Sequence, residues 1–321
     1  MKSRIACLAA LLMCACALPL AAQTLVTDIT VPGSPNGIAV NPTTNRIYVA
    51  SGNTSSGPAV IVIDGSTNAV IDTVDTPQGA SFVAVNQATN RVYDAGCIFG
   101  QTETCTVTVI DGATDRVIAT IPLASPAGIG VQAIAVDPVW NRIYVADDNN
   151  LEIAEINGHN NAVTYFNTGN TETLGLAVDF GTHQIIGAPS GGAIDVYNGT
   201  THGRRLIGVG LINQDVAVDS FTHRAYITNN AGSTLGVVDL QSSRVVNVTV
   251  GNAPYGVCVD YLSNLIFVAN TGDQTVAEVN GTTNTVIGTV NADSSLLDVN
   301  PSTKLVYASD PFGTTVHVIS E

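Results

Sequence analysis

The sequence predicts an all-β fold, a seven-bladed β-propeller built from four-stranded antiparallel blades. Three observations predict it. A stretch of about forty residues, clearest over 35–74, alternates short apolar runs with turn residues and reads as four strands. The same pattern recurs seven times along the chain. The seventh copy ends one strand short, and residues 25–31 supply a strand of the missing kind, so we expect the N-terminal strand to close the last blade.

The first strand of each copy ends in a valine followed by Asn or Asp, residue types that suit the start of a tight turn. The second strand carries an aromatic residue in every copy except the fourth, where Ile186 takes that place. The third strand often ends at an Asn-Gly or Asp-Gly turn, which favours a hairpin to a fourth strand. The repeating valines are Val40, Val85, Val136, Val178, Val218, Val259 and Val299. An open solenoid is the alternative, but it leaves the missing strand unexplained.

The first 22 residues have the features of a secretory signal peptide. Lys2 and Arg4 precede an apolar run over 5–18, and the small residues Ala21 and Ala22 follow. The alternative is a membrane anchor, but this run is shorter than the roughly 20 residues that span a bilayer. We therefore expect cleavage after Ala22, a single domain over 23–321, and a periplasmic or secreted location.

The charge balance restricts the partners. Only 12% of the residues are charged, and the formal net charge is −15. Cleavage would remove two positive charges and take it to about −17. An acidic surface repels phosphate backbones and anionic lipids, so we expect neither nucleic acid binding nor membrane insertion. The 45% hydrophobic content is enough for a large core, and we expect a monomer.

Three cysteines remain after residue 22. Cys97 and Cys105 flank a polar loop between two predicted antiparallel strands, where facing residues lie close enough for a disulfide. A metal site is the alternative for these thiols, but no histidine or second cysteine pair lies near them in the sequence. Cys258 lies inside an apolar strand, where a free buried thiol is expected.

The segments RIYVAS, RIYVAD, AYITNN and LIFVAN stand on the second strands of four copies. The repeat that contains them resembles the YVTN-type β-propeller repeat of YncE-like proteins, and the resemblance covers essentially all of 23–321. It implies a propeller and an exported or surface location. It implies little about activity, because most members of that family have no established one.

The innermost strands of a propeller line its central channel, and ligands meet the face where the chain enters those strands. Aligning the copies at this entry gives a polar ring that includes Asn36, Gln132, Gln214 and Tyr255. Asp215 is the one charge in the next ring. One further ring holds Asp298, where the other copies have Ala or Cys.

We predict ligand binding by Asn36, Gln132, Gln214, Asp215, Tyr255 and Asp298. For Asp298 two interpretations stay open. It either bonds backbone amides or hydroxyls near the closure of blade seven, or it forms a pair of channel carboxylates with Asp215 that holds a cation or polar ligand.

Other polar residues indicate no catalytic site. The run Asp147-Asp148-Asn149-Asn150 has oxygen ligands for Ca²⁺ but lacks the spacing of a calcium loop, so a solvated turn is the preferred interpretation. His183 and His223 occupy hairpin turns and are interpreted as turn residues. No nucleophile elbow, metalloprotease, haem or phosphate-loop motif occurs. We predict no catalytic residues, no metal site and no cofactor, with Ca²⁺ as a weak alternative.

The sequence therefore predicts an exported, non-catalytic scaffold that binds a protein, glycan or small ligand through its loop-bearing face. The alternative is a metal-dependent lactonase-like hydrolase at the central channel. Asp215, Asp298 and Asn36 would supply its ligands, although no motif matches.

Overall fold

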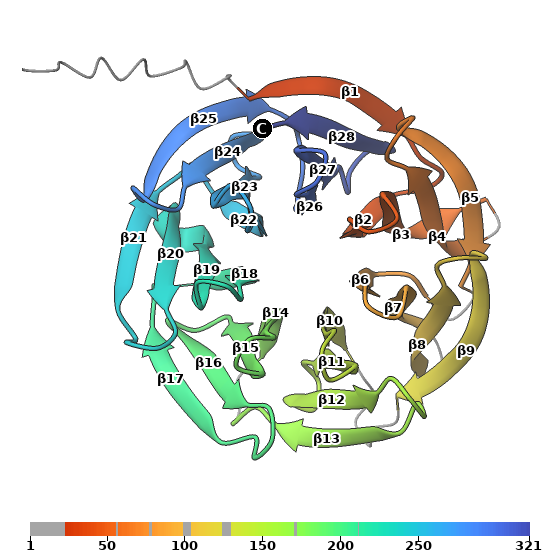
Figure 1. The fold of residues 1–321 in the computed structure, drawn as a ribbon, viewed down its shortest axis with the longest axis horizontal. Coiled ribbons are helices and arrows are strands. Elements are labelled where there is room, and N and C mark those ends of the chain that lie inside the picture. The colour runs from red at the N-terminus through yellow and green to blue at the C-terminus, as the bar shows by residue number, and fades with distance from the viewer. Residues whose placement is uncertain are drawn as a thin grey trace, which may run out of the picture.

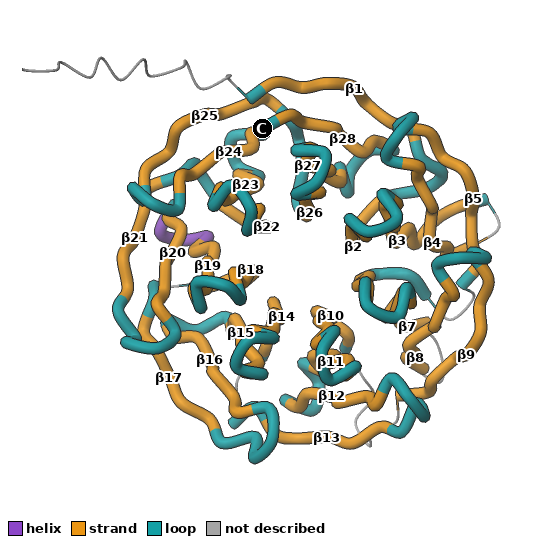
Figure 2. The backbone as a smooth tube through the Cα atoms, in the orientation of Figure 1, coloured by secondary structure: helices purple, strands orange, loops and turns teal. Residues whose placement is uncertain are grey.

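The computed structural model describes residues 23–55, 57–76, 79–98, 104–123, 130–169, 172–210 and 212–321. Over these ranges the strands form seven four-stranded antiparallel sheets, arranged as blades around a central axis (Figure 1). Strands and turns make up almost all of the described chain, and one short 3₁₀ helix, η1 (Asn230–Gly232), interrupts them (Figure 2). The predicted seven-bladed β-propeller is confirmed.

Each blade runs from an innermost strand at the axis to an outermost strand at the rim. The innermost strands of blades one to seven are β2 (Pro35–Asn41), β6 (Phe82–Asn86), β10 (Val131–Asp137), β14 (Thr173–Asp179), β18 (Asn213–Asp219), β22 (Pro254–Asp260) and β26 (Leu296–Asn300). The second strands are β3 (Arg46–Thr54), β7 (Arg91–Ile98), β11 (Arg142–Asp147), β15 (Gln184–Pro189), β19 (Arg224–Asn229), β23 (Leu265–Asn270) and β27 (Leu305–Ser309). The third strands are β4 (Gly57–Asp64), β8 (Thr104–Asp111), β12 (Glu152–Asn157), β16 (Ala193–Asn198), β20 (Thr234–Asp239), β24 (Thr275–Asn280) and β28 (Thr315–Ser320). The outermost strands are β5 (Ala69–Asp75), β9 (Arg116–Leu123), β13 (Val163–Asn167), β17 (Arg204–Gly208), β21 (Val245–Thr249), β25 (Thr285–Asn291) and, for blade seven, β1 (Thr24–Thr30).

The two ends of the described chain meet in blade seven. Strand β1 pairs antiparallel with β28, with Thr24 opposite Ser320 and Thr30 opposite Thr315. Figure 1 shows the red β1 along the outer side of the dark blue β28. The pairing leaves β28 with a neighbour on both sides, so the ring closes without an unpaired third strand.

The core consists of apolar layers between neighbouring blades. Both faces of the second and third strands are covered, so these strands are nearly continuous apolar runs. The repeated aromatic of the second strand is buried in each of the six blades that have it, at 0–1% exposure: Tyr48, Tyr93, Tyr144, Tyr226, Phe267 and Tyr307. Full burial of one large apolar side chain stabilises the fold by roughly 1.5–3 kcal/mol.

A belt of polar contacts joins the blades at the turn after the innermost strand. The last turn residue has positive φ, as in Asn90 (52°) and His183 (57°), and at six of the seven junctions its side chain bonds the Asn or Asp that ends the innermost strand of the preceding blade. At the junction of blades five and six, Asn264 bonds Thr282 instead. Three such contacts join amides: Asn41–Asn90, Asn86–Asn141 and Asn300–Asn45, at 2.7–2.8 Å. Three join a carboxylate to a histidine ring or a lysine: Asp137–His183, Asp179–His223 and Asp260–Lys304, at 2.6–2.7 Å. The hairpin residues that define the repeat therefore also connect the blades.

The predicted disulfide is confirmed. Cys97 of β7 and Cys105 of β8 are bonded across the pair of strands, with their Cα atoms 4.1 Å apart. Cys258 is free and buried, as predicted. Within the described ranges no helix has the length and hydropathy needed to cross a membrane.

Candidate functional site

The entry to the central channel contains a cavity of about 140 Å³. It is lined by the starts of the innermost strands, as the alignment of the copies predicts. Four predicted ligand residues converge on it: Gln132 of β10, Gln214 and Asp215 of β18, and Tyr255 of β22. The rest of the lining is largely apolar, including Phe82, Leu174, Leu176, Leu296 and Leu297. The surface that these residues expose to the cavity is nonetheless more polar than apolar, so a ligand there would meet mainly polar groups.

Asp215 lies at the wall of this cavity, and its carboxylate is held by two backbone groups. Oδ1 accepts a hydrogen bond from the N–H of Val216 (2.8 Å), and Oδ2 accepts one from the N–H of Val257 (3.1 Å). Val257 is the residue of blade six that corresponds to Val216. The carboxylate therefore bridges matching N–H groups on two successive innermost strands.

Asp298 makes the same bridge at another junction, deeper in the channel. Its Oδ1 accepts from the N–H of Val299 (2.8 Å), and its Oδ2 accepts from the N–H of Val40 (2.7 Å). Val40 corresponds in blade one to Val299 in blade seven. Asp298 is absent from the lining of the entry cavity. These contacts match the interpretation in which Asp298 bonds backbone amides near the closure of blade seven.

Hydroxyl groups accompany both carboxylates, a relationship that sequence reasoning missed. Thr228 accepts from the N–H of Asp215 (3.0 Å) and donates to the carbonyl of Tyr255 in the next blade (2.6 Å). Ser309 donates to the carbonyl of Asn36 in the next blade (2.6 Å). The corresponding second-strand position is alanine in the other five blades: Ala50, Ala95, Ala146, Ala188 and Ala269. This coincidence with the two aspartates was visible in the aligned copies.

Burial raises the pKa of both the Asp215 and Asp298 carboxyls to about 6, from an ordinary value of 3.8. The backbone N–H bonds act in the opposite direction, because they favour the ionised form. Burial also raises the pKa of the Cys258 thiol, and the nearby carboxylates of Asp298 and Asp215 add to this effect. The thiol is therefore protonated at neutral pH and a poor nucleophile.

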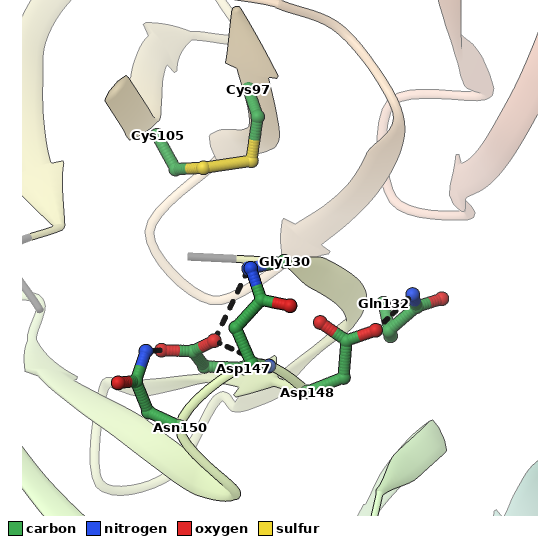
Figure 3. The surroundings of a disulfide bond; sticks show 8 residues. Cys97, Cys105, Gly130, Gln132, Asp147, Asp148 and Asn150 are labelled. Carbon is green, nitrogen blue, oxygen red and sulfur yellow. Dashed lines mark hydrogen bonds between the residues drawn. A yellow bond between two sulfur atoms is a disulfide. The ribbon is translucent and has the colours of Figure 1, made fainter. Parts of the chain in front are cut away.

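The acidic run 147–150 forms the turn after β11 and positions one cavity residue. Asp148 Oδ2 accepts a hydrogen bond from Gln132 Nε2 (2.6 Å), which fixes the carboxamide at the cavity wall (Figure 3). Asp147 is buried and accepts from the N–H of Gly130 (3.2 Å) and from Asn150 Nδ2 (2.8 Å). These carboxylates thus serve as acceptors for their own turn and for Gln132.

A second hollow of about 480 Å³ adjoins the cavity on the same face. Tyr255 borders both spaces and is 39% exposed. The predicted residue Asn36 lines this second hollow, as does Phe312, which is 90% exposed. Phe312 and the neighbouring Thr271 lie on loops between second and third strands, where single residues differ freely between copies. Sequence reasoning therefore had no repeated signal for them.

Two polar groups at the cavity have no hydrogen-bond partner among the described residues and are available to a ligand. Within the described residues, the side chain of Gln214 and the hydroxyl of Tyr255 make no hydrogen bond, whereas Gln132 is bound to Asp148. Burial raises the pKa of the Tyr255 hydroxyl, and the charge of Asp215 raises it further. The hydroxyl is therefore neutral and can both donate and accept. No group of three or more His, Cys, Asp or Glu side chains in the described ranges is arranged to hold a metal ion.

The opposite face exposes apolar turn residues over blades three to six, which sequence reasoning also missed. Phe221 is 67% exposed and contacts the rings of Phe180 and Tyr261, with centroids 5.9 and 5.2 Å apart. Trp140 stacks on His183 at 3.8 Å. Blades one, two and seven have threonine, alanine or serine in this turn, so the contrast between copies was the available signal.

Comparison with known proteins adds no identity. No family model matches the chain, and no curated protein matches it.

Proposed function

We propose that the protein is an exported binding propeller without catalytic activity, and that its cavity-bearing face takes a neutral, hydroxyl-rich ligand such as a sugar residue of a glycan. The observation that carries this proposal is the convergence of Gln214, Asp215 and Tyr255, from two adjacent blades, on one cavity. The resemblance of the repeat to the YVTN-type family and the Cys97–Cys105 disulfide support an exported protein.

The ligand class follows from the groups at the cavity. A carboxylate and free amide and hydroxyl groups match the alternating donors and acceptors of a polyol. The exposed rings of Tyr255 and Phe312 offer flat apolar surface next to these groups. The acidic surface disfavours anionic ligands. A neutral sugar meets all three conditions, whereas a phosphate or sulfate ester carries a negative charge and fails the third.

Titration against a panel of neutral and acidic saccharides tests the proposal. We expect binding of a neutral member, with at least tenfold weaker affinity in Gln214→Ala and in Tyr255→Ala. The matched control is Gln241→Ala, because Gln241 is an exposed glutamine on a hairpin turn away from the cavity. Binding that is equally weakened by the control, or absent for every neutral saccharide, contradicts the proposal.

The lactonase alternative is tested with the same protein. Hydrolysis of simple lactones that depends on added Ca²⁺ or Zn²⁺, and that is lost in Asp215→Asn, would replace the binding function with an enzymatic one.

A further inference from the structure

Glu278 of β24 is a buried carboxylate without a partner among the described residues. It is 2% exposed, makes no hydrogen bond or ion pair with them, and lies opposite Phe267 of β23 and Gly288 of β25. Burial alone raises the pKa of this carboxyl, with no charged neighbour contributing. Neither oxygen is fully enclosed, yet a carboxylate on a side chain this buried is costly unless a cation or several donors face it.

Blade three shows which partners this position takes. Glu155 of β12 has the same register, opposite Tyr144 of the second strand. It is bound by the guanidinium of Arg142 and by His202 Nε2 at 2.9 Å. Arg142 comes from the same blade and His202 from the next. The carboxylate in blade three therefore has two side-chain partners, a guanidinium and an imidazole ring.

Blade six keeps the carboxylate but not these side chains. Leu265 stands where blade three has Arg142, since each lies opposite the asparagine that ends its third strand. Gln23 belongs to blade seven, which follows blade six, and occupies the position that His202 has in blade four, which follows blade three. His202 precedes Gly203, whose carbonyl accepts from the N–H of Asn198 at the end of β16. Gln23 likewise precedes Thr24, which pairs with Ser320 at the end of β28.

Gln23 and Glu278 both border Gly288 of β25. Gln23 is 6% exposed, and neither atom of its carboxamide has a hydrogen-bond partner in the described structure. Gly288 leaves the space between them open, because a Cβ there would lie 3.0 Å from Glu278 Oε2 and 3.5 Å from Gln23 Cβ. The start of β1 lies beside β25 at the rim of the ring (Figure 1). The backbone nitrogen of Gln23 is two bonds from that Cβ.

We propose that the α-ammonium group created on Gln23 by cleavage after Ala22 is the counter-ion of Glu278, in the position that His202 takes toward Glu155. The inference rests on the processing that the proposed export requires. Before cleavage the nitrogen is a neutral amide with one N–H. After cleavage it is a cation with three donors. Processing thus completes the contact between blade six and the strand that closes blade seven.

The test uses the chain 23–321, released from an N-terminal fusion so that it begins with a free Gln23. Treatment with glutaminyl cyclase gives a matched neutral form, because the α-amine attacks the side-chain Cδ and ammonia leaves, forming a lactam. We expect the lactam to lower the Tm by about 2 °C or more in the wild type. In Glu278→Gln the lactam should change the Tm by less than half as much, since the two changes remove the same interaction. Equal lactam effects in both backgrounds overturn the proposal.

A second measurement does not use the lactam, whose ring could change the local packing as well as remove the charge. The pKa of the α-amine, followed by NMR of ¹⁵N-Gln23, should lie above the ordinary 7.7–8.0 and return to that range in Glu278→Gln. Glu155→Gln is the matched control and should leave it unchanged. An α-amine pKa in the ordinary range for the wild type overturns the proposal that the α-ammonium group is the counter-ion of Glu278. N-terminal sequencing of the exported protein judges the processing separately, because a start other than Gln23 contradicts only the cleavage that the inference assumes.

Discussion

The carboxylate of Asp298 accepts a hydrogen bond from the backbone N–H of Val40, at 2.7 Å and across a separation of 258 residues. The bond joins the innermost strand of the last blade to that of the first. Ring closure therefore does not depend on the β1–β28 pairing at the rim alone, because this carboxylate joins the two blades at the axis, as do the Asn300–Asn45 and Ser309–Asn36 bonds. The Asp215–Val257 bond repeats the arrangement between blades five and six.

Replacing Asp298 with alanine should destabilise the protein by about 2–3 kcal/mol. The change leaves two N–H groups at the axis without their acceptor, and each unsatisfied buried donor costs roughly 1–3 kcal/mol, less where channel water replaces the acceptor. Urea denaturation of Asp298→Ala, followed by fluorescence, measures the loss. An unchanged midpoint together with a lost ligand-induced shift would support a ligand-binding role for Asp298 instead.

Asp215→Ala provides the comparison. It should cost a similar amount of stability, because the carboxylate makes the same two backbone bonds. It should also weaken ligand binding, because Asp215 lines the cavity and Asp298 does not. Loss of binding in both variants to the same degree would contradict this division of roles.

The stability contributed by these two carboxyls should fall as pH rises from 4 to 6. Their folded-state pKa values are about 6, above the ordinary 3.8, so in this window the native state holds protons that the unfolded chain has released. Their contribution is fully present below pH 4 and lost above pH 6. We expect a decrease on the order of 1–2 kcal/mol for each group, with screening by channel water taken into account.

The wild type should be compared with Asp215→Asn/Asp298→Asn, since other carboxyls titrate in the same range. For Asp260, for example, burial raises the pKa, but hydrogen bonds with Glu321, Lys304 and Ser263 together outweigh this and lower it, so Asp260 acts in the opposite direction. The difference in free energy of unfolding between the two proteins isolates the pair. A difference independent of pH between 4 and 6 would show that the carboxyls titrate normally.

The fold was predictable from the sequence because each copy repeats the same strand and turn signals. Apolar runs, Asn-Gly turns and the missing last strand are local features of the sequence. Because seven copies can be aligned, a strand or turn that is unclear in one copy can be recognised from the others. The strands of blade four formed despite Ile186, since an isoleucine fills the position at 0% exposure. The Cys97–Cys105 bond followed from two strands joined by a short loop.

The site was only partly predictable, because the copies show which residue is unusual but not what it contacts. Asp215 and Asp298 were found as exceptions in the alignment, yet their donors belong to neighbouring blades. The contact between Gln132 and Asp148 depends on the path of a loop that no other copy shares. Phe312 lies on another such loop. Residues of this kind are placed by tertiary structure, which the repeat does not encode.

Removing the disulfide with Cys97→Ser/Cys105→Ser should cost about 2.5 kcal/mol. The bond closes a short loop, with a sequence separation of 8, and the estimate is the chain entropy that this loop returns to the unfolded state. Thermal unfolding of the variant and of the reduced wild type should agree. Cys258→Ser in the reduced protein is the control, and a Tm that responds to reductant in the double variant would indicate another disulfide.

The belt contact between Asp137 and His183 should be replaceable by a pair of asparagines. Asp137→Ala leaves His183 and the N–H groups of Val139 and Trp140 without an acceptor, so we expect a loss of about 2–3 kcal/mol. Asp137→Asn/His183→Asn recreates the amide pair seen at Asn41–Asn90, and asparagine tolerates the positive φ of 57° at position 183. This double variant should stay within about 1 kcal/mol of the wild type.

Urea midpoints of the single and double variants measure the coupling at this junction, and the same exchange at Asp179–His223 is the matched test at the next one. His183 also stacks on Trp140, whereas no such stack involves His223 among the described ring contacts. The exchange should therefore be better tolerated at Asp179–His223. A double variant as unstable as Asp137→Ala would mean that the contact requires the carboxylate, and that the Asn–Asn and Asp–His contacts of the belt are not interchangeable.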